Sequence, residues 1–338
     1  MPVITFREAI NQALRQEMER DEKVVLMGED VAGGAGGSAG GGEAAGGVMG
    51  VTAGLCTQFG RERVIDTPIT ESAIMGMGAG AALTGLRPVA ELMFADFVGV
   101  CFDQIYNQAA KFRYMFGGKA RTPLVIKTLV GAGMGAGPQH SQAIYPLLTM
   151  VPGLKVLTPS NPYDAKGMMI QAIREDDPVI FCEHKMLLGM EGEVPEEPYT
   201  IEFGKAKLTR EGTDLTLISM SHMVNHCNTV ADRLAEDDYS VDVVDIRSTS
   251  PLDRPAILES ARKTGRVVVV DEANPMCSMA SEISSIIAEH AFEDLDAPIR
   301  KVTAPHTPVP ASPTLEALYL PSPDKIEMVA RELLEYEL

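Results

Sequence analysis

Short apolar runs alternate with helical patterns along most of the chain, and this alternation restricts the fold more than any other feature. A helix capped by Thr5 and Glu8 opens the chain. In the first half we expect strands at 24–27, 63–67, 88–94, 124–130, 155–158 and 179–182, and helices at 71–84, 96–111 and after the cap Asn161. In the second half we expect strands at 213–220, 241–246 and 267–270 and a closing helix from Asp324. The alternation predicts an α/β fold in which helices cover both faces of a mostly parallel sheet.

The alternation stops once, near the middle of the chain. Residues 190–203, MEGEVPEEPYTIEF, combine acidic residues with two prolines, which neither a helix nor a strand favours. A chain of 338 residues suits two domains of roughly 150 residues each. We therefore predict a first domain at 1–190, a linker at 191–204 and a second domain at 205–338, each with its own α/β sheet.

Charge and apolar content exclude several classes of partner. The chain has 29 Lys and Arg against 47 Asp and Glu, and its net charge of −18 repels nucleic acid and anionic membranes. No run approaches the roughly 20 apolar residues of a membrane helix, and the first residues do not resemble a signal peptide. The cysteines are scattered, with no CxxC pair, which argues against disulfides or a zinc cluster. We expect a cytoplasmic protein with reduced, packed thiols.

Two glycine-rich segments raise the question of a nucleotide site. Residues 32–47 follow a predicted strand, and their Gly and Ala content predicts a mobile loop. Neither this loop nor GAGMGAG at 131–137 contains G-x-G-x-x-G. The related motif G-x-G-x-x-A does occur in the loop at 32–47. A nicotinamide-dependent oxidoreductase therefore stays an alternative function for the chain. The phosphate-binding motif G-x-x-x-x-G-K-[ST] is missing from the sequence.

Glu71 stands where the predicted strand at 63–67 passes into a helix rich in glycine and alanine. An acid in the first turn of a helix ordinarily complements the helix dipole, and that interpretation stays open. The small residues that follow allow a ligand to approach closely and surround the carboxyl group with apolar neighbours, which favour its protonated form. Because proton relay needs a glutamate that readily takes up a proton, Glu71 is a candidate catalytic residue.

His140 is the second candidate catalytic residue. It lies in PQHSQ, on a loop after the glycine-rich turn that follows the strand at 124–130. Loops at the carboxyl ends of parallel strands form the ligand sites of α/β proteins. His184, which follows the next predicted strand, is a weaker candidate for the same reason. The alternative is that each is an ordinary hydrogen-bonded histidine.

Two further polar clusters have less specific patterns. Glu29 lies in GED at 28–30, at the end of the first strand, where a solvated acid is the ordinary interpretation. His222 and His226 have the i, i+4 spacing of a metal site, but no carboxylate or third ligand lies beside them in sequence. We interpret this pair as part of a helix face.

Several sequence blocks of the first 190 residues occur together in one known family. They are GED, RVIDTPITE, GLRPVAELMF, DQIYNQAAK, QHSQ, PGLKVLTPSNPYDAKG and AIREDDPV, in this order. Together they resemble the β subunit of the thiamine-diphosphate-dependent first component of the 2-oxo acid dehydrogenase complexes. The second half resembles the same family more loosely. The resemblance implies a pyrimidine-binding fold followed by a transketolase C-terminal-like domain.

The resemblance also implies that thiamine diphosphate lies between two chains. In the family an α subunit holds the diphosphate and Mg²⁺ through a GDG motif, which this sequence lacks, and the β subunit receives the aminopyrimidine ring. Glu71 matches the glutamate that hydrogen-bonds the ring, Glu29 an acid near it, and Phe97 an aromatic residue beside the pyrimidine. His140 matches a histidine that points at the reacting carbon. The implied assembly is an α2β2 heterotetramer.

Some members of the family bind a potassium ion through a segment that AIREDDPV resembles. The matching residues are Leu124, Ala172, Glu175 and Asp177. Glu175 stands where the family usually has aspartate and Asp177 where asparagine is common, so this match is incomplete. The loop at 32–47 also departs from the family, and nothing about its contacts can be transferred.

The finer resemblance concerns the substrate. The stretches ELMFADFVGVCFDQIYNQAAK, TPSNPYDAKG and GGVMGVTAGL look more like acetoin-cleaving dehydrogenase β subunits than pyruvate or branched-chain ones. The resemblance then implies cleavage of acetoin, or decarboxylation of a 2-oxo acid, with transfer of the acyl group to lipoamide on a dihydrolipoamide acyltransferase core. A non-catalytic assembly subunit is the alternative of another class. For a single-chain transketolase this chain is too short.

Overall fold

The fold is described from a computed structural model for residues 1–33 and 46–337. Within these residues the first half forms a seven-stranded sheet of order β12-β6-β7-β5-β4-β2-β3. Its parallel strands are β2 (Val24–Glu29), β3 (Val64–Thr67), β4 (Arg87–Phe94), β5 (Val125–Val130), β6 (Lys155–Leu157) and β7 (Val179–His184). The edge strand β12 (Ser248–Ser250) is antiparallel and comes from the second half. The predicted α/β fold with a mostly parallel sheet is confirmed.

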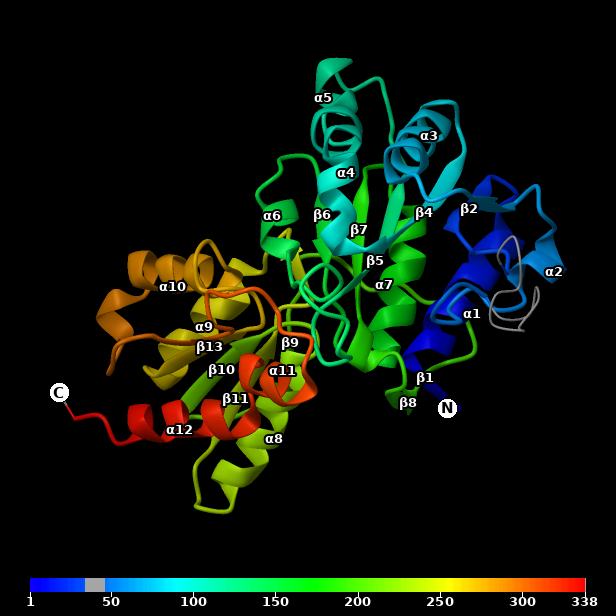
Figure 1. Ribbon diagram of the computed structural model, residues 1–338. Helices are drawn as coiled ribbons and strands as arrows, with labels where there is room; N and C mark the ends of the chain where they lie inside the picture. Colours follow the sequence, from blue (N-terminus) through cyan, green and yellow to red (C-terminus); the bar gives the residue numbers. More distant parts are fainter. Residues whose placement is uncertain (34–45, 338) are drawn as a thin grey trace.

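Helices cover both faces of this sheet (Figure 1). Leu26 packs in one apolar cluster with α1 (Phe6–Arg20) and α7 (Pro162–Arg174), whereas its neighbour Met27 packs in another with α3 (Glu71–Leu83). Successive side chains of a strand point to opposite faces, so a strand buried on both sides is mostly apolar. This is why the first-half strands could be recognised as mainly apolar runs, even though β4, β5 and β7 each bury a charged residue.

Both predicted helix caps are present. The Thr5 hydroxyl accepts a hydrogen bond from Glu8 N, while the Glu8 carboxylate accepts one from Thr5 N, which makes a complete capping box for α1. The Asn161 side chain accepts a hydrogen bond from Asp164 N at the start of α7. Local capping chemistry therefore places the first residue of each helix.

The segment predicted as one helix at 96–111 is divided into short pieces. Cys101 has φ −120° and ψ 20°, outside the helical range, and the following turn is π-helical. A π turn inserts an extra residue into the helix, which apolar spacing does not reveal. The pieces are η2 (Ala95–Phe97), α4 (Val98–Asp103), η3 (Gln104–Ala109) and α5 (Phe112–Met115). The prediction of a continuous helix here was wrong.

The second half has a five-stranded sheet of its own, of order β14-β13-β10-β11-β9. Its strands are β9 (Lys207–Arg210), β10 (Leu215–Ser219), β11 (Val241–Asp245), β13 (Val267–Asp271) and β14 (Arg300–Thr303), with β9 antiparallel. Its helices are α8 (Met223–Ala235), α9 (Arg254–Thr264), α10 (Met279–His290), α11 (Pro313–Tyr319) and α12 (Pro323–Leu334). The central strands were predicted. The two edge strands, KLTR and RKVT, carry charged residues and lack an apolar run.

The two halves pack directly against each other. One apolar cluster contains Val156 of the first half together with Ile218 and Ile257 of the second. Within the predicted linker, β8 (Glu191–Glu193) pairs with β1 (Val3–Thr5), so the expectation of irregular structure throughout that segment was wrong. The domain limits themselves stay a prediction.

Three smaller expectations can be compared with the structure. Cys277 is exposed, which corrects the expectation that all thiols are packed, whereas the other cysteines are buried. The predicted loop at 32–47, with its dinucleotide-binding alternative, lies outside the described residues except at its two ends. Among the described helices none has the length and apolar character needed to cross a membrane. The remaining short helices are α2 (Leu55–Phe59), α6 (Tyr145–Thr149), η4 (Lys185–Leu187) and η5 (Phe292–Asp294).

Candidate active site

The four candidate site residues of the first half lie at the carboxyl ends of four strands of its sheet, and we call this end of the sheet the site edge. Glu29 is the last residue of β2, and Glu71 begins the helix that follows β3. Phe97 lies in η2, directly after β4, and His140 lies in the loop after β5. These four strands are adjacent and parallel, so their carboxyl ends meet.

Three aromatic rings form the centre of the site edge. The His140 ring lies edge to face with Phe94, at 4.8 Å between centroids, and with Phe97, at 5.3 Å. Phe94 and Phe97 are themselves 5.7 Å apart. The structure therefore brings the predicted pair Phe97 and His140 into contact and adds Phe94, which the sequence analysis missed. Its position as the last residue of a parallel strand was the available signal.

Polar contacts fix the backbone from His140 to Gln142. The buried Lys185 donates from Nζ to the carbonyl oxygen of His140 and lies 3.3 Å from Ser141 Oγ. Burial lowers the pKa of Lys185, although nearby acids oppose the effect. The Asp96 carboxylate accepts from the backbone N–H of Gln142 at 3.2 Å and from its side-chain amide at 2.8 Å. The backbone at and just after the histidine is thus held by groups from η2 and η4.

The acidic part of the site surrounds Glu29. Burial raises the pKa of Glu29, and the negative charges of Asp30, Glu71 and Glu91 raise it further. Carboxyl groups that repel each other in this way titrate as a coupled set, and the repulsion favours the protonated form of Glu29. Burial also raises the pKa of the Cys101 thiol to about 12, with Glu71 as a second cause. The site therefore combines two predicted carboxylates with an uncharged thiol.

A charged cluster is buried in the sheet beneath the site. Lys127 Nζ lies 2.5 Å from Glu91 Oε2 and 3.3 Å from Glu183 Oε2. Burial raises the pKa of Glu183 to about 7, although Lys127 opposes the shift. Buried charges are tolerated when they are paired, so these residues stabilise one another inside the sheet. Periodicity alone does not predict this cluster, and the available signal in the sequence was a charged residue inside each apolar strand.

The weaker candidate His184 has a different environment. It ends β7 and is buried, with Nε2 2.7 Å from Glu272 Oε2 of the second half. Its ring stacks on His222 at 4.8 Å, and His222 contacts His226 at 4.7 Å. Burial, with the charges of the two neighbouring histidines, lowers the pKa of His222 to about 3. His222 is therefore a neutral packing residue between the halves, which refines the prediction of a helix face.

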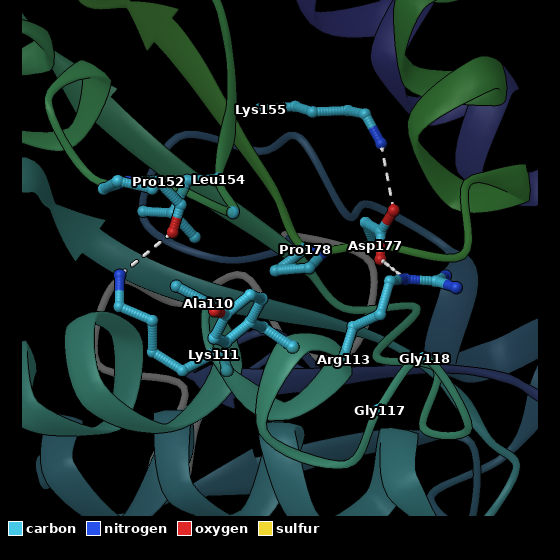
Figure 2. A pocket seen from close by; sticks show the side chains of 13 residues that line it. Ala110, Lys111, Arg113, Gly117, Gly118, Pro152, Leu154, Lys155, Asp177 and Pro178 are labelled. Atoms are coloured by element: carbon cyan, nitrogen blue, oxygen red, sulfur yellow. Dashed lines mark hydrogen bonds and ion pairs between the residues drawn. The ribbon is translucent and has the colours of Figure 1, made fainter.

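The four predicted potassium ligands lie just before β5, at the end of α7 and just before β7. Asp177 among them lines a pocket of about 860 Å³ (Figure 2). Lys155 Nζ lies 3.1 Å from Glu175 Oε1 and 3.5 Å from Asp177 Oδ2, and Asp177 also accepts a hydrogen bond from Arg113. The carbonyl oxygens of the other two predicted ligands accept backbone hydrogen bonds, Leu124 from Val179 and Ala172 from Glu175. Each predicted ligand therefore has a partner within the protein, and the potassium site stays a prediction.

The side chains of the site suit an aromatic ring system better than a phosphate group. An aromatic wall beside two carboxylates suits a planar heterocycle with ring nitrogens, which can stack and accept or donate a hydrogen bond. The acidic groups around Glu29 are a poor environment for a phosphate group, although Glu91 is paired with Lys127. Among the described residues no group of three or more His, Cys, Asp or Glu side chains is arranged to bind a metal ion.

Comparisons with known proteins agree with the division of the chain into two halves. Residues 3–191 match the transketolase pyrimidine-binding domain and residues 204–326 the transketolase C-terminal domain. The chain is 55% identical to the β subunit of acetoin:2,6-dichlorophenolindophenol oxidoreductase from Bacillus subtilis (strain 168), over 98% of this chain and 97% of the relative. It is 44% identical to the 2-oxoisovalerate dehydrogenase β subunit of the same organism, over 99% of this chain and the whole of the relative.

A solved structure supports the fold independently. A split-gene transketolase, described as an inactive β4 tetramer, superposes with a TM-score of 0.79 over 99% of this chain and the whole of that chain, at 23% identity. At this identity the likeness concerns the fold alone. The domain matches cover both halves of the chain, and the relatives match over nearly their full length. The chain therefore belongs to the family of acetoin and 2-oxo acid dehydrogenase β subunits built on the transketolase fold.

Proposed function

We propose that this chain is the β subunit of an acetoin-cleaving dehydrogenase component and forms the pyrimidine side of a thiamine diphosphate site. The observation that carries the proposal is the meeting of Glu29, Glu71, Phe97 and His140 at the site edge. Higher identity to the acetoin relative than to the 2-oxoisovalerate relative supports acetoin as the substrate. Pyruvate and branched-chain 2-oxo acids are the alternative substrates.

The acidic residues would act on the pyrimidine ring. When bound, thiamine diphosphate supplies a carbanion that adds to carbonyl carbon atoms. Glu71 would hold a proton at a nitrogen of the pyrimidine ring. Glu29, whose pKa is raised by burial and by its acidic neighbours, would keep a proton beside Glu71 and lower the repulsion between the two groups. Phe97 would provide an apolar wall for the ring.

His140 would act on the substrate rather than on the ring. Its imidazole lies against Phe94 and Phe97. Lys185 binds its backbone carbonyl oxygen, and Asp96 binds the backbone N–H of Gln142. A histidine in such a place can hold or pass a proton at a reacting oxygen atom. The two phenylalanines would exclude water from that proton transfer.

The remaining groups of the reaction must come from other chains. Because the acidic groups at the site edge disfavour a phosphate group, we assign the diphosphate and Mg²⁺ to an α subunit, and the assembly to an α2β2 heterotetramer. The acyl group would pass to lipoamide on a dihydrolipoamide acyltransferase core. The cytoplasm, where scattered thiols stay reduced, is the proposed location. Potassium at the four residues named above stays a proposal, and the ion would compete with Lys155 and Arg113 for the two carboxylates of that site.

Substrate competition tests the proposal. The chain reconstituted with its α subunit is given acetoin, pyruvate or 2-oxoisovalerate, with and without thiamine diphosphate, and reduction of a dye is followed. We expect acetoin turnover to exceed turnover of either 2-oxo acid by at least about tenfold and to require the cofactor. Preference for pyruvate would reassign the substrate, and turnover without thiamine diphosphate would refute the proposal. Acyl transfer to added lipoamide tests the acceptor.

A further inference from the structure

The glycine-rich segment 131–137, which precedes His140, is bound by two carboxylates of the second half. Ala132 N donates to Glu272 Oε1 at 2.7 Å. Gly133 N donates to Glu316 Oε1 at 2.8 Å, and Gly135 N donates to Glu316 Oε2 at 2.7 Å. Glu272 follows β13 and Glu316 lies in α11. Both oxygen atoms of Glu316 therefore hold the loop of the other half.

Both carboxylates are buried, with 3% of each residue exposed. Burial alone would raise the pKa of Glu272, but the His184 side chain and the Ala132 N–H outweigh it, so the pKa is lowered and the carboxylate stays charged. Hydrogen bonds from N–H donors to a charged acceptor are roughly twice as strong as neutral ones. Together with the two bonds to Glu316, the bond from Ala132 to Glu272 attaches the loop backbone to the second half at three N–H groups.

The loop has no space for a side chain at Gly131 or Gly133. A Cβ atom on Gly131 would lie 2.0 Å from His184 Nε2, and one on Gly133 would lie 2.7 Å from Met186 Sδ. Both glycines also have positive φ, 88° and 112°, which other residues rarely adopt. The GAGMGAG sequence is thereby explained: its N–H groups bind protein carboxylates at close range, as a phosphate-binding loop would bind an anion.

The far end of the same loop carries His140. Gly131 N donates to the Gln142 carbonyl at 3.3 Å and closes the loop, while Lys185 binds the His140 carbonyl. The backbone from 131 to 142 is thus held at its start by the second half and at its end by Lys185. A shift at the start would move the imidazole relative to Phe94 and Phe97.

We propose that Glu316 and Glu272 are positioning residues, through which the second half holds His140 in its working place. The proposal rests on the function proposed above only for the statement that His140 acts in the reaction. Without the Glu316 carboxylate, the N–H groups of Gly133 and Gly135 would lose their acceptors in a partly buried place, which disfavours the attached conformation. The loop would then detach and His140 would sample unproductive positions.

The test uses Glu316→Gln in the chain assembled with its α subunit. Glutamine keeps the size of the side chain but presents an amide NH2 group to one of the two loop donors. The matched control is Glu332→Gln, on the half-exposed ion pair with Arg300, which does not touch the loop. In Glu316→Gln we expect kcat to fall about 100-fold with the KM for acetoin and the half-saturating thiamine diphosphate concentration within about twofold. The control should match the wild type.

A double-mutant cycle and hydrogen exchange separate positioning from general damage. In a His140→Ala background, Glu316→Gln should change kcat by less than about twofold, because the group that it positions is gone. Amide exchange in 131–142 should rise at least about tenfold in Glu316→Gln and stay unchanged in Glu332→Gln. Equal losses with and without His140, or unchanged exchange in the loop, would overturn the proposal. A wild type without thiamine-dependent turnover would refute the proposed function. The exchange measurement would still show whether Glu316 holds the loop that carries His140.

Discussion

The imidazole of His140 lies edge to face with the ring of Phe94, at 4.8 Å between centroids. The contact joins the end of β4 to the loop after β5, and Lys185 lies over the same phenylalanine ring at 5.6 Å. An aromatic pair in this geometry orients both rings and contributes about 0.5–1.5 kcal/mol beyond the area that it buries. Phe94 is therefore expected to set the direction of the histidine.

The first prediction follows from this contact. Phe94→Leu keeps an apolar side chain but removes the ring that orients His140, so kcat should fall about tenfold while the protein stays folded. Phe292→Leu, at a ring that is 73% exposed in the second half, is the control and should leave turnover unchanged. Steady-state turnover of the complex with the α subunit measures both. Wild-type kcat in Phe94→Leu would show that the contact does not matter.

The second prediction concerns pH and the buried Glu183, whose pKa is raised to about 7. The pKa of this carboxyl group is higher in the folded state, about 7, than in the unfolded chain, about 4.5. The group therefore stabilises the fold fully at pH values below about 4.5, and this contribution is lost as the pH rises through about 7. The wild type should therefore lose stability relative to Glu183→Gln by up to about 3 kcal/mol between pH 5 and 8. Glu211→Gln, at an exposed glutamate, should show no such trend. Denaturant unfolding at several pH values measures the difference, and a constant difference would contradict the assignment.

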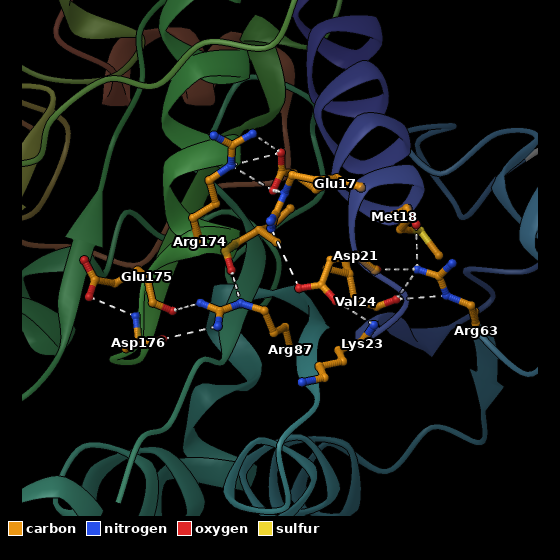
Figure 3. Close-up of polar contacts among 12 residues, drawn as sticks. Glu17, Met18, Asp21, Lys23, Val24, Arg63, Arg87, Arg174, Glu175 and Asp176 are labelled. Carbon is orange, nitrogen blue, oxygen red and sulfur yellow. Dashed lines mark hydrogen bonds and ion pairs between the residues drawn. The ribbon is translucent and has the colours of Figure 1, made fainter.

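The third prediction separates stability from activity. Glu17, fully buried in α1, accepts two hydrogen bonds from Arg174 Nε and one from Nη2, and a further one from Arg20 (Figure 3). Glu17→Gln removes the charge from this buried cluster and should lower the free energy of unfolding by about 2–4 kcal/mol. The thiamine-dependent turnover of the folded enzyme should not change, because these contacts lie between α1 and α7, away from His140.

The control for this prediction is Glu22→Gln, an exposed acid just after the same helix, which should keep wild-type stability. Thermal and denaturant unfolding measure the stability of both variants. A Glu17→Gln protein with wild-type stability would mean that the cluster adds nothing. A variant that is stable but inactive would mean that Glu17 acts on the site.

The parallel core of the fold could be predicted because its strands are buried on both faces and appear as apolar runs. The edge strands β9 and β14 could not, since one side of an edge strand faces solvent and its residues are charged. The π-helical turn after α4 was also missed, because apolar spacing does not record an extra residue in one turn. Local patterns thus describe the centre of each sheet better than its margins.

The candidate site was partly predictable for a similar reason. Glu29, Glu71, Phe97 and His140 each follow a recognisable strand, and parallel strands bring such positions together. The role of Glu316 could not be predicted, because its partner Gly133 lies 183 residues away in sequence. Contacts between the two halves depend on packing that short-range periodicity does not contain.

The central claim is that Glu71 holds a proton at a nitrogen of the pyrimidine ring, in a site shared with an α subunit. The most direct measurement is thiamine-diphosphate-dependent acetoin turnover of Glu71→Gln in the reconstituted complex, beside the exposed control Glu62→Gln. We predict a loss of at least about 100-fold for Glu71→Gln and wild-type turnover for the control. Wild-type turnover in Glu71→Gln would contradict the account.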